Sequence, residues 1–171
     1  MRALLVDGYN LIHAHKELSL LVEKDMDAAR EGLVRELMPL AAPGFYGLVI
    51  VVFDAAGSPN PEPVFEERRG VTVVFTRRRQ TADSFIERMA RRMSARAEVN
   101  EVAVATSDRL LSSLAAGFGA RAIDGASLME RAREAAEETR EEARRAGARR
   151  VPLEERVGEE VRRLLDEMRY R

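Results

Sequence analysis

The chain has no cysteine among its 171 residues. Disulfide bonds, thiolate metal ligands and cysteine nucleophiles are therefore excluded. No apolar run approaches the 18 or more residues of a membrane-spanning helix, and the N-terminus leads directly into a strand-like run instead of a signal-peptide pattern. We therefore expect a cytoplasmic protein without membrane contact.

Lysine is nearly absent: only Lys16 and Lys24 accompany 26 arginines. A phospho-receiver domain needs a lysine after its last strand, and neither lysine lies there. A P-loop NTPase needs a glycine-rich stretch that ends in Gly-Lys, which is also missing. His13 and His15 have no partner at a ligand spacing, so packed or solvated imidazoles are favoured over metal ligands.

Charge of one sign is concentrated in the middle of the chain, although the net charge is only −1. Residues 1–67 carry 5 basic and 11 acidic side chains, and residues 97–171 carry 14 basic and 16 acidic ones. Residues 68–96 carry 9 arginines and only 2 acidic side chains. If a polyanion binds, it binds at this middle stretch.

Short apolar runs alternate with amphipathic stretches along the chain. The runs that predict strands are 3–6, 48–53, 71–75, 102–105 and 120–123, with a short edge strand at 64–66. The stretches that predict helices are 27–42, 81–97, 108–119, 126–146 and 153–168. This alternation is typical of an α/β protein with a mostly parallel sheet and helices on both faces.

Carboxylates follow the predicted strands. Asp7 follows the first strand, Asp54 the second and Asp108 the fourth, and Asp83 opens the helix after the third. The carboxyl ends of parallel strands share one edge of a sheet, so these acids converge there. Two carboxylates 4 Å apart repel by roughly 4 kcal/mol at an effective dielectric constant near 20. Hard oxygen ligands without histidine or cysteine point to Mg²⁺ or Mn²⁺.

Each acid also has a structural explanation. Asp7 precedes Gly8 and is suited to capping a turn or a helix. Asp83 and Asp108 lie in first turns of helices, where acids are favoured anyway. Glu87 can pair with Arg91 four residues on, which is an ordinary surface arrangement. A haloacid-dehalogenase-like phosphatase fits less well, because it needs a second aspartate two residues after the first, where this chain has Tyr9.

Four segments together resemble one known family. They are Leu-Val-Asp-Gly-Tyr-Asn-Leu-Ile at 5–12, Val-Phe-Asp-Ala at 52–55, Thr-Ala-Asp-Ser-Phe-Ile-Glu at 81–87 and Val-Ala-Thr-Ser-Asp at 104–108. In order and spacing they look like the YacP-like branch of NYN-domain nucleases, within the PIN-like ribonuclease fold. The resemblance runs from about residue 2 to about residue 145.

The resemblance implies a three-layer PIN-like domain with a central sheet in the order 3-2-1-4-5. We expect this domain to span 1–147, with a C-terminal helical extension over 148–171 packed on it or beside it. In that order the first and fourth strands are neighbours, so Asp7 and Asp108 lie on either side of the point where the strand order reverses.

The resemblance also assigns roles to single residues. It makes Asp7, Asp83 and Asp108 metal-binding acids, Asn10 a site amide, Asp54 a further acid near the metal and Glu87 a ligand acting directly or through water. Phosphate-binding candidates are Arg77, Arg78 and Arg79 beside Asp83, with Arg68 and Arg69 expected at the same rim. Tyr9 is a candidate for stacking on a base, or else a packed core residue.

The function that these features predict is metal-dependent endoribonuclease activity with Mg²⁺ or Mn²⁺. The resemblance permits messenger RNA on the ribosome as the substrate, because YacP-like proteins include a ribosome-associated endoribonuclease. The alternative is an RNA- or ribosome-binding module without turnover. The acids argue against that alternative, because they would repel bound phosphates.

Overall fold

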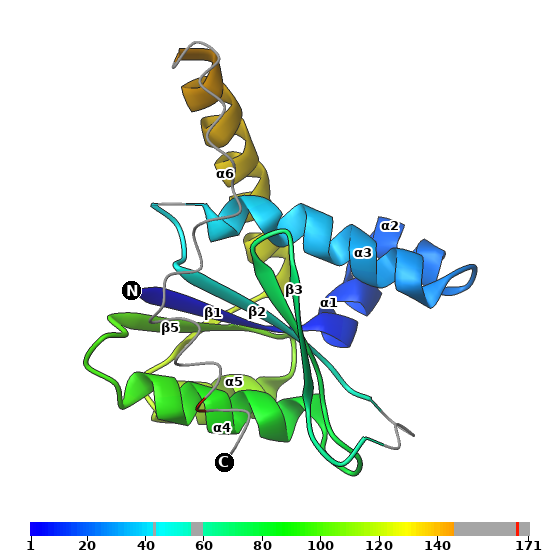
Figure 1. Ribbon diagram of the computed structural model, residues 1–171, viewed down its shortest axis with the longest axis vertical. Helices are drawn as coiled ribbons and strands as arrows, with labels where there is room; N and C mark the ends of the chain where they lie inside the picture. Colours follow the sequence, from blue (N-terminus) through cyan, green and yellow to red (C-terminus); the bar gives the residue numbers. More distant parts are fainter. Residues whose placement is uncertain (43, 56–59, 146–166, 168–171) are drawn as a thin grey trace.

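The predicted strands assemble into one six-stranded sheet in the order β3-β4-β2-β1-β5-β6. Figure 1 shows it in a computed structural model of the chain. The strands are β1 (Arg2–Asp7), β2 (Leu48–Phe53), β3 (Val64–Arg68), β4 (Val71–Phe75), β5 (Glu101–Ala105) and β6 (Arg121–Ile123). All pairings are parallel except that of β3 with β4. The parallel strands keep the predicted order 3-2-1-4-5, and β3 extends the sheet by one antiparallel edge strand.

The structure describes residues 1–42, 44–55, 60–145 and 167. The predicted helix at 153–168 and the expected extension at 148–171 therefore lie outside the described residues, apart from Glu167. The carboxylate of Glu167 forms an ion pair with Arg96. Within the described ranges, no helix is long and apolar enough to cross a membrane.

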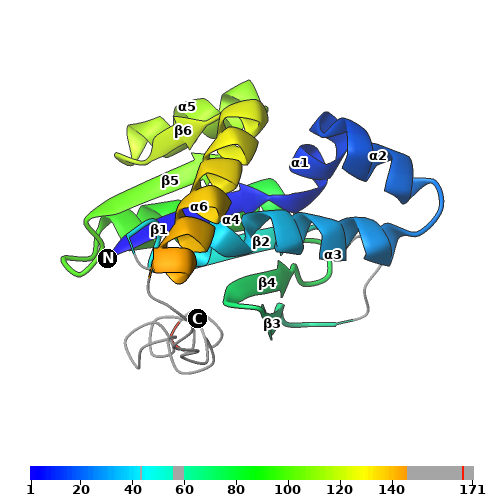
Figure 2. The same cartoon turned by 90° about the horizontal axis from the view of Figure 1, so that it is seen from above.

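The helices cover both faces of the sheet. They are α1 (Gly8–Ala14), α2 (Lys16–Val22), α3 (Met26–Leu37), the 3₁₀ turn η1 (Met38–Ala41), α4 (Ala82–Ser94), α5 (Arg109–Gly117) and α6 (Gly125–Arg145). Figures 1 and 2 show α3 and α6 on one face and α4 and α5 on the other. The predicted three-layer α/β class is confirmed.

Two buried clusters result from the alternation of side chains along the central strands. Leu4 and Val6 of β1 pack in the cluster that α3 and α6 cover. Ala3 and Leu5 point to the opposite face and pack with α4 and α5. Because successive strand side chains face opposite ways, a strand covered on both faces reads as a continuous apolar run.

Two helical stretches differ from the sequence-based expectation. The region 8–22, which has no clear period, forms two helices of 7 residues each. Such short helices are stable only through tertiary packing, which periodicity does not report. The helix predicted at 27–42 ends at Leu37, because Pro39 lacks an N–H and converts the continuation into a 3₁₀ turn.

Candidate active site

The carboxyl edge of the parallel strands carries the predicted acids. Asp7 is the last residue of β1 and pairs with Val52 of β2, so Asp54 follows two residues beyond that partner. On the other side of β1, Val6 pairs with Ala105, three residues before Asp108. The expected neighbourhood of strands one and four is thus confirmed. We call this edge, with Asp7, Asp54, Asp83 and Asp108, the acidic rim.

Asp7 is the most deeply placed of these acids, with 8% of its surface exposed. It caps α1, because its Oδ1 accepts a hydrogen bond from the main-chain N–H of Asn10 at 3.1 Å. Burial raises the pKa of Asp7 to about 6; the bond from Asn10 lowers this pKa, and the negative charges of Asp83, Asp108 and Asp54 raise it. Asp7 therefore caps a helix and is also repelled by the negative charges of three other acids.

Asp83 and Asp108 lie at the starts of α4 and α5, the two helices on the face of the sheet opposite α3 and α6. Asp108 caps α5, and its Oδ1 accepts from the N–H groups of Leu110 at 2.7 Å and Leu111 at 2.9 Å. Asp83 lies in the first turn of α4, which Thr81 caps. The pKa of Asp83 is raised, first by partial burial and then by Asp108 and Asp54. Both acids therefore lie at a helix start and also repel one another.

The donor set of the acidic rim fits a hard divalent cation, because all four side chains offer carboxylate oxygens. In the part of the chain that the structure describes, however, no three histidine, cysteine, aspartate or glutamate side chains form a group that could hold a metal ion. The acids are near enough for Asp108 and Asp54 to raise the pKa of both Asp7 and Asp83, without being gathered around one point. A bound cation would offset the repulsion that they now exert.

Asn10 joins the two loops that carry Asp7 and Asp108. Its Oδ1 accepts hydrogen bonds from the main-chain nitrogen of Ser107 at 2.9 Å and from the hydroxyl of Ser107 at 2.6 Å. The structure therefore gives this oxygen a positioning role. The predicted role of Asn10 as a site amide stays a prediction.

Gly8 opens α1, and its lack of a side chain matters for space. A Cβ atom at this position would lie 2.3 Å from the ring of Phe53, a contact that real structures do not show. Gly8 is the first residue of α1 and is needed there for the close approach of Phe53.

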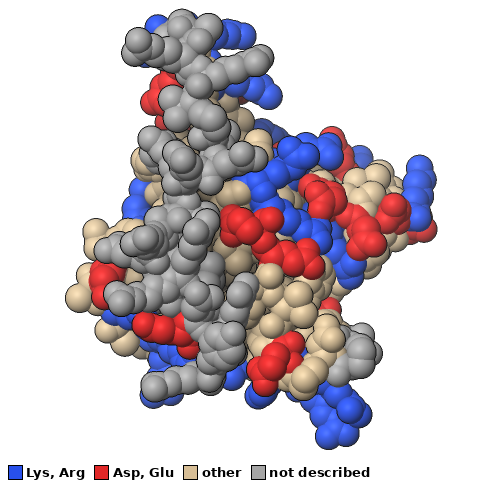
Figure 3. Space-filling model, in the orientation of Figure 1, with Lys and Arg blue, Asp and Glu red and all other residues tan. Residues whose placement is uncertain are grey.

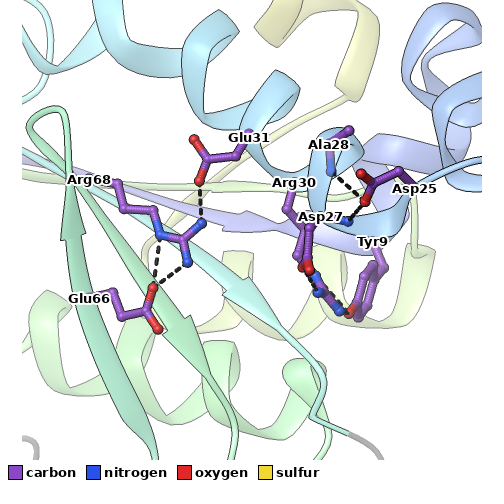
Figure 4. Close-up of polar contacts among 8 residues, drawn as sticks. All are labelled: Tyr9, Asp25, Asp27, Ala28, Arg30, Glu31, Glu66 and Arg68. Carbon is purple, nitrogen blue, oxygen red and sulfur yellow. Dashed lines mark hydrogen bonds and ion pairs between the residues drawn. The ribbon is translucent and has the colours of Figure 1, made fainter.

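Tyr9 packs inward. Its ring lies 5.1 Å from that of Phe53, centroid to centroid, at an angle of 57°. Its hydroxyl accepts hydrogen bonds from Nε of Arg30 at 3.1 Å and from a second nitrogen of the same guanidinium. Figure 4 shows this pair between α1 and α3. The structure thus favours the packed alternative for Tyr9, and stacking on a base stays untested.

Arg68 and Arg69 do not lie at the acidic rim, so that expectation is wrong. Arg68 ends β3 and pairs with Val71, the first residue of β4, so the turn between them lies at the amino edge of the sheet. The guanidinium of Arg68 forms ion pairs with Glu66 and Glu31, drawn in Figure 4. The reason is that β3 is antiparallel to β4 and carries the chain away from the rim.

Arg77, Arg78 and Arg79 do follow β4 at the rim edge, as expected. They line a pocket of about 440 Å³ with Pro61, Gln80, Ser84 and Arg88. We call this the arginine pocket. Figure 3 shows basic side chains projecting where the loop after β4 lies in Figure 1. Sequence reasoning missed Arg88 and Gln80. The helical spacing of Arg88 from Ser84 was the one available signal.

Glu87 lies half-buried on α4, one turn after Asp83. Among the described residues it forms no ion pair with Arg91, although the spacing allows one. Its predicted contact with a metal ion, direct or through water, stays a prediction.

Comparison with known proteins adds three findings. The profile of the YacP-like NYN domain matches residues 4–170. The uncharacterized protein YacP of Bacillus subtilis is 38% identical over 109 residues, which cover 63% of this chain and 61% of that protein. The alignment therefore spans less than two thirds of that relative.

Solved structures of Rae1 (YacP) from Bacillus subtilis have the same fold. A variant of Rae1 superposes with a TM-score of 0.68 at 27% identity, over 98% of this chain and 99% of that one. A second Rae1 structure superposes with a TM-score of 0.68 at 30% identity, over 85% of this chain and 82% of that one.

Proposed function

The chain belongs to the YacP-like NYN domain family, and from this membership we propose that it is a metal-dependent endoribonuclease acting at the acidic rim. One observation carries the proposal. Asp7 is buried at the carboxyl end of β1, and three further acids raise its pKa. A fold gains no stability from gathering unpaired carboxylates, so such a cluster is typical of a functional site.

Asp7, Asp83 and Asp108 would hold Mg²⁺ or Mn²⁺, with Asp54 and Glu87 as further candidates. The metal supplies water of lowered pKa and stabilises the charge that develops on the oxygens of a phosphodiester. Asp7 and Asp108 are fixed for this role, because Oδ1 of each accepts a hydrogen bond from a main-chain N–H at a helix start. Asn10 keeps the two loops together.

The arginine pocket supports RNA as the substrate. Arg77, Arg78 and Arg79 are exposed on the loop that leads into α4, which carries Asp83. Guanidinium groups bind phosphate oxygens strongly, so the loop would hold phosphates that flank the cleaved bond. We propose RNA, with messenger RNA on the ribosome as the specific target that family resemblance suggests.

The competing proposal is a binding module without turnover. It is favoured by one observation, which is that no three acids are gathered closely enough to hold a metal ion among the described residues. The burial of a carboxylate at the rim argues against it. A module that only binds phosphates would gain affinity by losing Asp7.

A cleavage assay distinguishes the nuclease from the binding module. Structured messenger RNA and translating ribosomes are incubated with the protein in Mg²⁺ or Mn²⁺, and new RNA ends are mapped. We expect cleavage that EDTA stops and that Asp7→Asn or Asp83→Asn lowers by about 100-fold or more. Asp25→Asn is the matched control, because Asp25 caps α3 in the same way and is not part of the rim. Cleavage that survives both substitutions would overturn the assignment, and EDTA-insensitive binding without cleavage would favour the module.

A further inference from the structure

The loops that follow β2 and β4 are joined at the acidic rim. The first loop begins with Asp54, and the second leads into the arginine pocket. The main-chain N–H of Thr76 donates a hydrogen bond to the carbonyl of Phe53 at 3.0 Å. The main-chain N–H of Arg78 donates to the carbonyl of Asn60, also at 3.0 Å. An acid of the rim and the phosphate-binding candidates therefore lie on loops that are bonded to each other.

The side chain of Thr76 adds a further bond between the two loops. Its Oγ1 accepts a hydrogen bond at 3.0 Å from the main-chain N–H of Ala55, the residue after Asp54. In a parallel ladder that continued one step further, this N–H would donate to the main-chain carbonyl of Thr76. The hydroxyl takes the place of that carbonyl where the pairing of β2 with β4 ends. Only 1% of the surface of Thr76 is exposed, so packing fixes the hydroxyl in this position.

Thr76 anchors Asp54 in place of a helix cap. Asp7 and Asp108 are held in position because they cap α1 and α5. Asp54 caps no helix among the described residues, and both peptide groups that flank it are bonded to Thr76 instead. The charge of Asp54 raises the pKa of Asp7 and Asp83, so its carboxylate lies near theirs. The placement of this acid therefore depends on Thr76.

We propose that Thr76 is a positioning residue of the acidic rim, whose hydroxyl fixes the main chain at Asp54 and its separation from Arg77. Arg77 follows Thr76 directly and lines the arginine pocket. Loss of the hydroxyl releases the N–H of Ala55 and lets the two loops separate, so metal binding and phosphate binding both weaken. The inference rests on the proposed function in taking the rim as the metal site and the arginines as contacts for RNA.

The test removes the hydroxyl of Thr76 and keeps the shape of the side chain. Mn²⁺ binding by the full chain is followed by electron paramagnetic resonance. We expect Thr76→Val to weaken binding about five- to ten-fold, the size of one lost hydrogen bond whose donor stays unpaired. Thr76→Ser keeps the hydroxyl and should bind Mn²⁺ like the unchanged protein. In a chain that already carries Asp54→Asn, adding Thr76→Val should have no further effect on Mn²⁺ binding, because the anchored carboxylate is gone.

Thr72 provides a matched control. It lies on β4 with 3% of its surface exposed, and its hydroxyl donates to Oε2 of Glu67 at 3.1 Å. Thr72→Val therefore also loses a hydrogen bond of a buried hydroxyl, but it should leave Mn²⁺ binding unchanged. Equal weakening by Thr72→Val and Thr76→Val would assign the effect to general loss of packing and overturn the proposal. Urea denaturation checks that both variants fold. If Thr76→Val does not fold, Thr76→Ala removes the same acceptor and is judged by the same outcomes.

A second arm measures RNA binding in EDTA, where no metal contributes. A labelled single-stranded oligoribonucleotide is titrated with the full chain at several salt concentrations. Thr76→Val should weaken binding and lower the slope of log affinity against log salt by about 0.7, the value for one contact to a single strand. Thr76→Ser and Thr72→Val should change neither quantity. Unchanged RNA binding by Thr76→Val would overturn the inference that one hydroxyl positions both loops.

The outcomes distinguish this inference from the proposed function. If cleavage depends on Asp7 while Thr76→Val binds Mn²⁺ and RNA like the unchanged protein, the nuclease proposal stands and the role of Thr76 is overturned. If Mn²⁺ and RNA binding depend on Thr76 as expected but no RNA is cleaved, the positioning role stands and the nuclease proposal is overturned. Absence of Mn²⁺ binding by the unchanged protein would overturn both.

Discussion

The side-chain oxygen of Asn10 accepts two hydrogen bonds from Ser107, which lies 97 residues further along the chain. Asn10 lies three residues after Asp7, and Ser107 directly precedes Asp108. The bonds therefore fasten together the starts of α1 and α5, which carry two acids of the rim. The spacing of these acids depends on one amide.

Replacing Asn10 by alanine should lower both stability and activity. We expect a loss of about 1–2 kcal/mol in the free energy of unfolding, because the N–H of Ser107 loses its acceptor. Cleavage should fall at least ten-fold, since the acids lose their fixed separation. Urea denaturation and RNA cleavage measure the two effects. Ser107→Ala removes only the hydroxyl, so it should cost less in both, and an equal or larger cost would contradict the account.

Replacing Gly8 by alanine should destabilise the protein by about 1–3 kcal/mol, the usual cost of overpacking a core. The added Cβ would meet the ring of Phe53. Adding Phe53→Leu should recover part of that loss, because the two changes share one contact. Gly117→Ala is the control, since a Cβ there has nothing within 4 Å and helix propensity favours alanine. Thermal denaturation of the unchanged protein and these three variants measures the losses. Equal losses for Gly8→Ala and Gly117→Ala would refute the packing explanation.

The raised pKa of Asp7 predicts how stability depends on pH without metal. The folded-state pKa is about 6, above the ordinary aspartate value of 3.8, so the folded state binds this proton more tightly than the unfolded state. The stabilising contribution of protonated Asp7 is fully present below pH 3.8 and is lost as the pH rises through 6. At pH 7, Asp7→Asn should therefore stabilise the metal-free protein by up to about 3 kcal/mol.

Denaturant titrations in EDTA between pH 4 and pH 7 measure this effect. The difference in unfolding free energy between Asp7→Asn and the unchanged protein should shrink toward pH 4. A difference that stays constant over this range would show that Asp7 does not titrate there.

Replacing Arg77, Arg78 and Arg79 together by alanine should weaken RNA binding and flatten its salt dependence, because phosphate contacts release counterions. The control replaces three exposed arginines of α6, namely Arg140, Arg144 and Arg145. Binding is measured by fluorescence anisotropy from low to high salt. An unchanged salt slope for the loop variant would identify these arginines as solvated side chains without a role in binding.

The strands and the acids of the site could be predicted from the sequence. The residues that surround them could not. Buried parallel strands read as apolar runs, so the strands and the acids that follow them could be predicted. The strand order came from the family resemblance. The place of Arg68 could not, because an antiparallel edge strand reverses the chain direction without a clear signal. The contact of Gly8 with Phe53 depends on packing between segments that are distant in the sequence. No periodicity in the sequence records such contacts.

Binding of Mn²⁺ is the most direct test of whether the acidic rim is a metal site. Titration followed by electron paramagnetic resonance reports free Mn²⁺ and requires no knowledge of the RNA target. We predict that the unchanged protein and Asp25→Asn bind Mn²⁺ alike, and that Asp7→Asn and Asp83→Asn each weaken binding at least ten-fold. Equal binding by all four proteins, or no binding by any, would contradict a metal centre built from Asp7, Asp83 and Asp108.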